Sequence, residues 1–242
     1  MKKVSIIIPS LNEEKLIERL LSQFTRKIRS ENNLEIIVSD GGSIDLTIQI
    51  AKKYADRVIL KKDNFQQNIS QGRNEGAKNS LGDVLIFLNA DTCVSDIEKF
   101  FALIKEVFKE DSVAAVTGPI EVFIDERIMS DRVFHFMYNN YVALLNRFVM
   151  GMGRGECHII RRDKFFESGG YDETLAAGED FDLYKRLRKL GKIIYRKDML
   201  IYESPRRYRK FGYSKVFWDW TKNSLSVLLF KRSVSKKWEA VR

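Results

Sequence analysis

The sequence has few of the residues and runs that are typical of membrane-spanning, disulfide-stabilised or metal-binding proteins. Its 242 residues include 2 cysteines and 2 histidines. Cys93 and Cys157 lack the spacing of a metal site or a disulfide framework. His135 and His158 are isolated in the sequence, which favours structural roles for both. No apolar run approaches the ~20 residues that span a bilayer.

Two further features bear on where the protein works and on whether it is globular. The first residues, MKKVSIIIPSLNEE, have a proline and two glutamates where a signal peptide needs a cleavage site. We therefore expect a first β-strand there and a cytoplasmic protein, with the inner face of the cell membrane as a peripheral location. Hydrophobic residues make up 44% and charged residues 31% of the chain, as in ordinary globular proteins.

The charge is unevenly distributed along the chain. Residues 185–242 contain 18 lysines and arginines against 4 acidic residues, whereas residues 1–184 carry 24 basic and 29 acidic residues. A mildly acidic body with a strongly basic last quarter suits nucleic acid, an anionic membrane surface or a phosphorylated ligand. A well-solvated lysine-rich surface is the alternative.

Apolar periodicity predicts an α/β fold. Near-continuous apolar strands are expected at 4–8, 35–40, 57–60 and 84–88, with helices from the repeats at 16–28, 46–54 and 70–80. Such alternation is typical of a mostly parallel, Rossmann-like sheet that is flanked by helices. Further along, we expect helices at 97–108, 163–168 and 178–191, and strands at 113–117, 120–124 and 156–160.

Polar residues follow three of the predicted strands. The three segments are Pro9-Ser10-Leu11-Asn12-Glu13, Asp40-Gly41-Gly42-Ser43 and Asn89-Ala90-Asp91. Each has a local explanation, since Ser10 and Glu13 match a capping box, Ser43 suits a helix N-cap and Asp91 suits a loop. Parallel strands would nevertheless bring all three to one sheet edge, where carboxylates bind a base, a ribose or a divalent cation. Together with Arg73, these residues are typical of a nucleoside-diphosphate site.

The segments VSIIIPSLNEEKLIERLL, EIIVSDGGSIDLTIQIA, GRNEGAKNSLGDVLIFLNADT and RRDKFFESGGYDETLAAGEDFDLYKRLRKLG resemble those of a family 2 glycosyltransferase with the GT-A fold. The resemblance covers residues 2–195. It implies transfer of a sugar from a UDP- or GDP-sugar to a hydroxyl acceptor, a glycan or a lipid-linked one, with inversion. The implied domain is 1–204, with a nucleotide-binding half at 1–117 and an acceptor half at 118–204.

The resemblance also implies roles for single residues. The nucleotide-sugar would contact the residues Pro9, Asn12, Glu13, Asp40, Gly42, Arg73, Asn89, Ala90 and Asp91. Within this set, Asp40 is expected at the base and Arg73 at the base or the diphosphate. Asp91 would be the main ligand of Mg²⁺ or Mn²⁺. Asn89 departs from the family's Asp-x-Asp motif and removes one negative charge near the metal.

The catalytic base is expected in the segment AAGEDFDLYKRL. By the resemblance, Glu179 and Asp180 match the family's Glu-Asp motif, and Asp180 would deprotonate the acceptor hydroxyl. The local alternative is that acidic residues in a first helical turn complement the helix dipole. We expect Asp182 to do only that.

The basic C-terminal segment, residues 205–242, extends beyond the strongest resemblance. Arg206 and Arg207 are expected to close over the diphosphate. Aromatic and leucine residues interleaved with lysines downstream favour an amphipathic helix. Two alternatives stay open for this helix, docking on an anionic membrane or packing on the body. A different class of function, non-catalytic nucleic-acid binding through this segment, is the alternative to the enzyme, but it leaves the three acidic strand ends unexplained.

Overall fold

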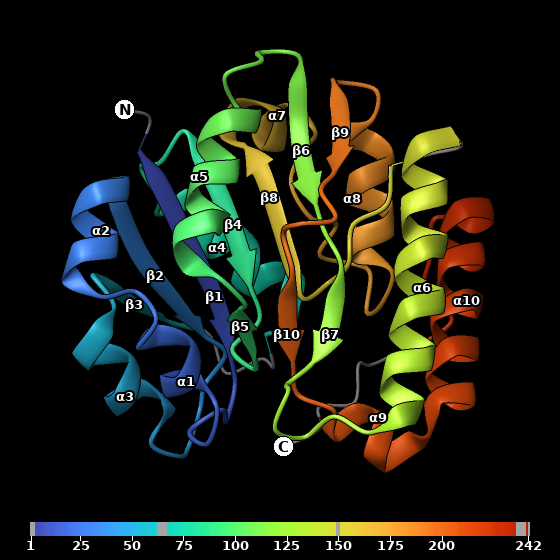
Figure 1. Cartoon of the computed structure of the whole chain (residues 1–242), viewed down its shortest axis with the longest axis horizontal. Coiled ribbons are helices and arrows are strands. Elements are labelled where there is room, and N and C mark those ends of the chain that lie inside the picture. The colour runs from blue at the N-terminus through green and yellow to red at the C-terminus, as the bar shows by residue number, and fades with distance from the viewer. Residues whose placement is uncertain (1–2, 62–66, 149–150, 236–240, 242) are drawn as a thin grey trace.

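The computed structural model describes residues 3–61, 67–148, 151–235 and 241. At its centre is a 7-stranded sheet with the strand order β3-β2-β1-β4-β8-β6-β9 (Figure 1). Strand β8 pairs antiparallel with β4 and β6, and the other pairs are parallel. The strands are β1 Val4–Ser10, β2 Leu34–Asp40, β3 Arg57–Leu60, β4 Val84–Leu88, β6 Val113–Thr117, β8 Cys157–Arg161 and β9 Lys192–Tyr195.

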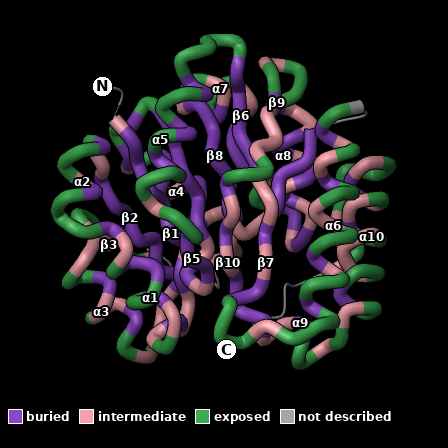
Figure 2. The backbone as a smooth tube through the Cα atoms, viewed as in Figure 1, coloured by how far each residue is buried: buried purple, intermediate pink, exposed green. Residues whose placement is uncertain are grey.

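Helices cover both faces of this sheet, and the alternation of side chains along β1 shows how. Ile6 and Ile8 pack into one core with α1, α2 and α5, whereas Ile7 points to the other face and packs with α4, α7 and α8. The five inner strands are accordingly buried along almost their whole length, whereas the edge strands β3 and β9 are more exposed (Figure 2). The helices are α1 Ile17–Leu21, α2 Arg26–Asn32, α3 Thr47–Tyr54, α4 Ile69–Lys78, α5 Ile97–Val107, α7 Arg162–Glu167 and α8 Glu179–Leu187.

The single helix predicted at 16–28 is wrong, because the structure divides it into α1 and α2. The Thr25 side chain accepts a hydrogen bond from the Ile28 N–H at 3.3 Å and so begins a second helix. The apolar spacing is kept across the break, since Leu20, Leu21, Phe24 and Ile28 are all buried. Periodicity therefore identified the buried face and missed the change of direction.

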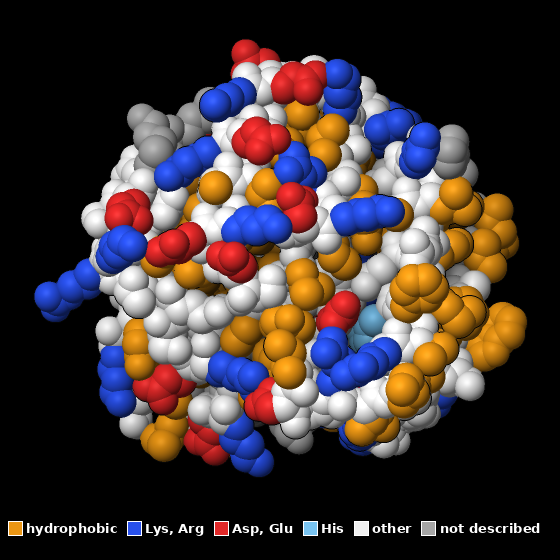
Figure 3. Space-filling view, viewed as in Figure 1, with side chains coloured by type: hydrophobic (Ala, Val, Ile, Leu, Met, Phe, Trp, Pro, Cys, Tyr) orange, Lys and Arg blue, Asp and Glu red, His pale blue; other side chains and the backbone are white. Residues whose placement is uncertain are grey.

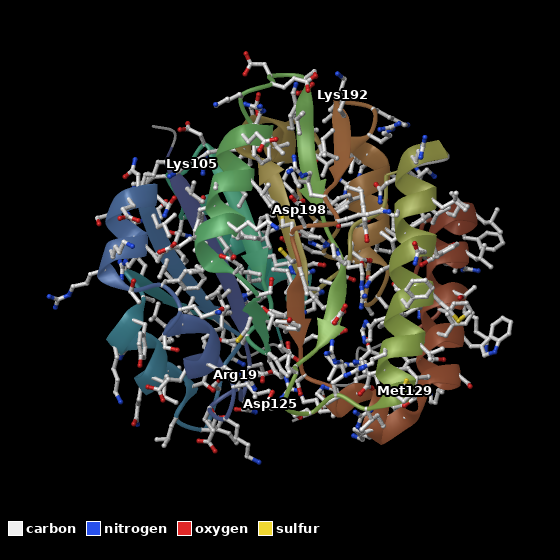
Figure 4. All side chains as sticks on the ribbon, viewed as in Figure 1. Arg19, Lys105, Asp125, Met129, Lys192 and Asp198 are labelled. Atoms are coloured by element: carbon white, nitrogen blue, oxygen red, sulfur yellow. The ribbon has the colours of Figure 1, made fainter. Side chains whose placement is uncertain are left out.

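A second, 3-stranded sheet has the order β5-β10-β7, formed by Thr92–Val94, Ile201–Glu203 and Ile120–Val122. The strand predicted at 120–124 is two residues too long, because the chain turns after Val122 and the Glu126 N–H donates to the Phe123 carbonyl at 3.0 Å. Figure 4 shows Arg19 and Asp125 beside this turn, where they form a two-pronged ion pair. Pairing with β5 carries the end of β10 to Asp91, whose carbonyl accepts from the Ser204 N–H at 3.1 Å.

Three helices flank the far end of the sheet: α6 Met129–Phe148, α9 Arg206–Phe211 and α10 Tyr213–Phe230. Figure 1 shows α6 and α10 side by side, and the rings of Tyr138 and Trp220 lie 5.3 Å apart between them. Helix α10 buries Val216, Asn223 and Val227, so it packs on the body. Among the described residues, no helix is long and apolar enough to cross a membrane.

Candidate active site

A cavity of about 480 Å³ lies beyond the carboxyl ends of β1, β2 and β4. Ligands bind at this place in open α/β sheets, and the volume is that of a typical small-molecule site. Strand ends, the loop at 151–156, the start of α8, and α6, α9 and α10 all contribute to its walls. Among the predicted site residues, its walls include Pro9, Glu13, Arg73, Asn89, Ala90, Asp91, Glu179, Asp180, Arg206 and Arg207.

Asp91, Glu13 and Arg206 meet at this cavity from three different elements. The Arg206 Nη2 lies 3.0 Å from Asp91 Oδ2 and 2.7 Å from each carboxylate oxygen of Glu13. The Glu13 side chain is 7% exposed, and Arg206 compensates its charge in this buried position. The structure therefore holds one guanidinium between two carboxylates that sequence alone places 78 residues apart.

Asp40, Asn12 and Gly42 do not line the cavity in this structure. Asp40 has no exposed surface, and its oxygens accept hydrogen bonds from Ser10 Oγ, Gly42 N, Ser43 N and Ser43 Oγ at 2.6–3.0 Å. It thereby fixes the loop after β2. Asn12 takes a left-handed conformation, with φ of 53°, and its Oδ1 accepts from Ile44 N at 2.9 Å.

The two capping explanations for these segments are wrong. The N-cap of α1 is Leu16 and that of α3 is Leu46, and neither side chain caps its helix. The Ser43 hydroxyl donates to Asp40 instead, and the Glu13 N–H donates to Thr47 Oγ1 at 2.7 Å. Polar residues after β1 and β2 thus join the two strand ends to each other.

Arg73 is a buried link between three walls of the cavity. Its side chain is 1% exposed, and Nη1 lies 2.9 Å from Glu179 Oε1. Its Nη2 donates to Asn89 Oδ1 at 3.1 Å and to the Gly155 carbonyl at 2.5 Å. The Asn89 oxygen is thus directed at Arg73, and Arg73 fixes Glu179 at the start of α8.

Asp180 follows Glu179 and has an unusual environment for a carboxyl group. Gly178 begins α8 with φ of 81°, which glycine adopts without strain, and this turn directs the first helical residues to the cavity. Burial, and next the charge of Glu179, raise the pKa of Asp180 to about 7. A carboxylate with this pKa lies near the optimum for accepting a proton at neutral pH.

A cluster of buried charges that sequence reasoning missed lies in the cavity wall next to Asp91. Arg154 Nη2 lies 3.1 Å from Glu203 Oε1, which also accepts from the Tyr208 hydroxyl at 2.7 Å. Burial, and next the charge of Glu156, raise the pKa of Glu203, and burial lowers that of His135 to about 3. The only sequence signal for this cluster was an arginine between two glycines in GMGRGE.

Helices α6 and α10 also contribute residues that the sequence did not place at the site. Tyr138 of α6 and Trp220, Asn223 and Ser224 of α10 line the cavity. They lie more than 40 residues from the polar strand ends, and aromatic residues in helices signal burial more often than binding. Contacts between the two helices bring them to the site.

The remaining reactive side chains have structural surroundings. His158 is fully buried, and its Nδ1 lies 2.7 Å from the Tyr171 hydroxyl oxygen. Cys93 and Cys157 are free and buried, and burial raises the pKa of the Cys93 thiol to about 11. Within the part of the chain that the structure describes, no group of three His, Cys, Asp or Glu side chains is placed to hold a metal.

Comparison with known families assigns this architecture. The model of glycosyl transferase family 2 matches residues 5–168, which is more than half of the chain. The chain therefore belongs to glycosyl transferase family 2. The family predicted from the sequence motifs is confirmed. Arg73, Asn89 and Asp91 lie within the matched part of this family 2 glycosyltransferase, whereas Glu179 and Asp180 lie beyond it.

Curated relatives of this family 2 glycosyltransferase are distant in sequence. The probable glycosyltransferase YdaM of Bacillus subtilis is 27% identical over 202 residues, covering 79% of this chain and 48% of YdaM. A Methanococcus voltae enzyme, a dolichyl N-acetyl-alpha-D-glucosaminyl phosphate 3-beta-D-2,3-diacetamido-2,3-dideoxy-beta-D-glucuronosyltransferase, is 28% identical over 223 residues, covering 81% and 64%. The chain thus spans about half to two thirds of the length of these relatives.

Solved structures confirm the predicted GT-A fold of this family 2 glycosyltransferase. The mannosyltransferase PcManGT from Pyrobaculum calidifontis, in complex with GDP-Man and Mn²⁺, has a TM-score of 0.69 at 18% identity over 93% of this chain and 62% of its own. Glucosyl-3-phosphoglycerate synthase from Mycobacterium tuberculosis, with Mn²⁺, UDP and phosphoglyceric acid, has a TM-score of 0.62 at 16% identity over 94% and 78%.

Proposed function

We propose that the protein is an inverting glycosyltransferase that moves a sugar from a UDP- or GDP-sugar to a hydroxyl acceptor. The observation that carries the proposal is that Asp180, with its raised pKa, lines the same cavity as Asp91 and Arg206. One carboxyl group that is suited to accept a proton therefore shares a site with a carboxylate suited to a metal ion and a guanidinium suited to a diphosphate. Family membership supports the same reaction class.

The donor is assigned to the half of the chain formed by residues 1–117. Pro9, Ser10 and Gly41 line the cavity at the ends of β1 and β2, and Asn68 lines it at the start of α4. Asp40 supports this wall from behind through its four accepted hydrogen bonds. The nucleobase of the donor is assigned as uracil or guanine, since the solved neighbours carry GDP-Man in one case and UDP in another.

The residues present fit a divalent cation held jointly with the donor. Asp91 offers a carboxylate whose side chain is 24% exposed, and among the described residues only Arg206 donates a hydrogen bond to it. Mg²⁺ is typically bound by one or two carboxylates together with substrate phosphates, so a lone aspartate is sufficient. When bound, Mg²⁺ or Mn²⁺ would neutralise charge on the leaving diphosphate. Two of the solved neighbours are in complex with Mn²⁺.

Arg206 and Arg207 are assigned to the diphosphate. Both line the cavity at the start of α9, and Arg206 already lies between the carboxylates of Glu13 and Asp91. A guanidinium there attracts phosphate oxygens and stabilises the charge that develops on the leaving group. Glu13 keeps Arg206 in place, so its role is that of a positioning residue.

The acceptor is assigned to the half formed by residues 118–204, where Asp180 is the base. Asp180 takes the proton of the acceptor hydroxyl while that oxygen forms a bond to the anomeric carbon and the bond from this carbon to the donor phosphate breaks. Attack from the face opposite the leaving group inverts the anomeric centre. Glu179 is held by Arg73 at 2.9 Å, and its charge helps to keep the pKa of Asp180 near neutrality.

A binding screen tests the proposal directly. The protein is titrated with UDP, GDP, ADP and their sugars, with and without Mn²⁺, by calorimetry. We expect one uridine or guanosine nucleotide to bind and to require the metal. The matching nucleotide sugar should be hydrolysed slowly. Asp91→Asn should abolish the metal-dependent binding of the nucleotide, whereas Asp182→Asn serves as a control that should bind like the unchanged protein. Metal-independent binding, or no binding of any nucleotide, would contradict the proposal.

A further inference from the structure

Helix α6 exposes an apolar stripe on the side that faces away from the body. The inward side of this helix is set by Asp131, His135, Val142 and Asn146, which are buried. On the opposite side, apolar residues recur at helical spacing, with exposed fractions of 49–71%. They are Met129, Val133, Phe136, Met137, Tyr141 and Leu144. Surface helices of globular proteins normally carry polar side chains on the outer face, so α6 is apolar where water is expected.

Helix α10 repeats this pattern beside α6. Its exposed large apolar side chains are Phe217, Trp218, Leu225, Leu229 and Phe230, with exposed fractions of 39–68%. Figure 3 shows hydrophobic side chains gathered over α6 and the neighbouring helix at the right edge of the molecule. We call the eleven residues of these two sets the α6–α10 surface. Contiguous exposed apolar patches of this kind mark interaction sites.

The charge around the α6–α10 surface points to one kind of partner. Lys222, Lys231 and Arg232 are exposed in or just after α10. The one acidic residue of this helix, Asp219, pairs with Lys215. Apolar side chains flanked by basic ones are typical of helices that lie in an anionic membrane interface. A second copy of the chain would instead bring two sets of positive charge together, which opposes association.

The same two helices join this surface to the active site. Their outer sides form the α6–α10 surface, and their inner sides supply Tyr138, Trp220, Asn223 and Ser224 to the cavity wall. A bilayer against the outer side would therefore lie one helix diameter, about 10 Å, from the cavity. An acceptor that is carried in the bilayer would be presented close to Asp180.

We propose that the α6–α10 surface docks on an anionic bilayer and that the acceptor hydroxyl belongs to a lipid-linked molecule in that bilayer. The docking stands on exposed apolar area and charge alone, whereas the acceptor class rests on the proposed function. Docking buries the apolar stripes among the acyl chains and leaves the lysines at the level of the headgroups.

Flotation with vesicles tests the docking. The protein is mixed with vesicles of phosphatidylcholine alone or with phosphatidylglycerol added, and the floated fraction is measured. We expect flotation with the anionic vesicles, weakened by salt. A variant with Phe136→Ser, Met137→Ser and Leu229→Ser should lose binding by about ten-fold or more for each side chain. Lys222→Gln with Lys231→Gln should lose about five-fold for each charge.

Matched controls separate docking from other causes. Leu60→Ser with Leu81→Ser removes apolar side chains that are 50% and 60% exposed elsewhere on the chain, and should float like the unchanged protein. Circular dichroism should show all variants folded, since exposed substitutions change stability little. Nucleotide binding with Mn²⁺ should also be unchanged in the α6–α10 variants, which distinguishes failure of docking from failure of the proposed function.

Three results would overturn the docking. The first is a protein that stays unfloated with both kinds of vesicle. The second is equal flotation of the unchanged protein and the serine variant. The third is a concentration-dependent dimer in sedimentation that the serine variant abolishes, because the surface would then bind a second copy. If docking holds, a short soluble acceptor should be used less well than the same acceptor on a lipid in vesicles, and equal use would overturn the acceptor class.

Discussion

The Arg206 guanidinium lies 3.0 Å from the Asp91 carboxylate, in the position where a cation is expected when the donor is bound. It also contacts both oxygens of Glu13 at 2.7 Å. A side chain at the start of α9 thus offsets part of the negative charge of these two carboxylates. We therefore expect any metal at Asp91 to share or replace this contact, and the position of α9 to be coupled to the occupancy of the site.

Loss of Arg206 is expected to destabilise the protein. In Arg206→Gln the Glu13 carboxylate, whose side chain is 7% exposed, loses the charged hydrogen bonds from Arg206, at a cost of about 1.5–3 kcal/mol in the free energy of unfolding. Denaturant unfolding measures this change. Arg196→Gln is the matched control, because Arg196 pairs with Glu106 and Asp198 at the surface and should cost less than about 1 kcal/mol. Equal costs for the two variants would mean that Arg206 stabilises the fold no more than a surface arginine does.

Mn²⁺ should restore part of the stability that Arg206→Gln removes. Without the guanidinium, a divalent cation no longer competes with Arg206 for the carboxylates of Glu13 and Asp91. A ligand that binds only the folded state raises its stability. We expect Mn²⁺ alone to raise the melting temperature of Arg206→Gln by more than that of the unchanged protein. Adding Asp91→Asn should remove the difference, and an equal response of all three proteins would argue against competition between metal and arginine.

Asn89→Asp is expected to strengthen metal-dependent nucleotide binding. Asn89 Oδ1 accepts from Arg73 Nη2 at 3.1 Å, and an aspartate oxygen can accept the same hydrogen bond. The substitution therefore keeps the link and adds one negative charge near Asp91. We expect the Mn²⁺ concentration for half-maximal UDP or GDP binding to fall about ten-fold, which corresponds to ~1.4 kcal/mol. An unchanged requirement for Mn²⁺ would mean that the charge at position 89 does not reach the metal.

Much of the fold was predictable because it depends on local periodicity. Each apolar run that the sequence analysis assigned to the central sheet is a strand of that sheet, and β4 ends at Leu88, directly before Asn89. The position of the polar residues after β4 was predictable for the same reason, since the carboxyl ends of parallel strands lie at one edge of the sheet. The boundary errors, at Thr25 and after Val122, arose where a single capping hydrogen bond or turn decides the end of an element.

Much of the site was not predictable, because it depends on contacts between distant segments. Arg206 reaches Glu13 only because β10 pairs with β5, and no periodicity specifies that pairing. Asp40 illustrates the converse. The family resemblance implied contact with the nucleobase, and in this structure the hydroxyls of Ser10 and Ser43 and two N–H groups donate to its oxygens. Sequence shows which residues reach an edge and not which way they face.

Asp180→Asn is expected to abolish transfer while donor binding persists. An amide cannot take the proton of the acceptor hydroxyl, so the rate should fall by about 10²–10⁴-fold or more. Asp182→Asn is the matched control, because Asp182 pairs with Arg186 at 2.6 Å and is not among the residues that line the cavity. Nucleotide release in a coupled assay measures the rate, and calorimetry measures donor binding. Loss of donor binding in Asp180→Asn, with transfer unimpaired in what remains bound, would contradict the assignment of the base.

The raised pKa of Asp180 also predicts how stability changes with pH. In the folded protein burial and Glu179 raise this pKa to about 7, whereas in the unfolded chain an aspartate titrates at about 3.9. Between these values the folded state holds a proton that the unfolded state releases, so this group makes the protein progressively less stable as pH rises from about 4 to about 7. Above about 7 the loss is constant.

Removing the titrating group should remove this loss, so Asp180→Asn is expected to be more stable than the unchanged protein at pH 8 and equally stable near pH 4. Denaturant unfolding at a series of pH values measures the difference between the two proteins, in which the contributions of all other titrating groups cancel. The transfer rate of the unchanged protein should rise about ten-fold per pH unit below about 7 and level off above it, because the base acts only when deprotonated. A stability difference that is independent of pH, or a rate that levels off near pH 4, would mean that Asp180 titrates normally and that its burial does not tune it for proton transfer.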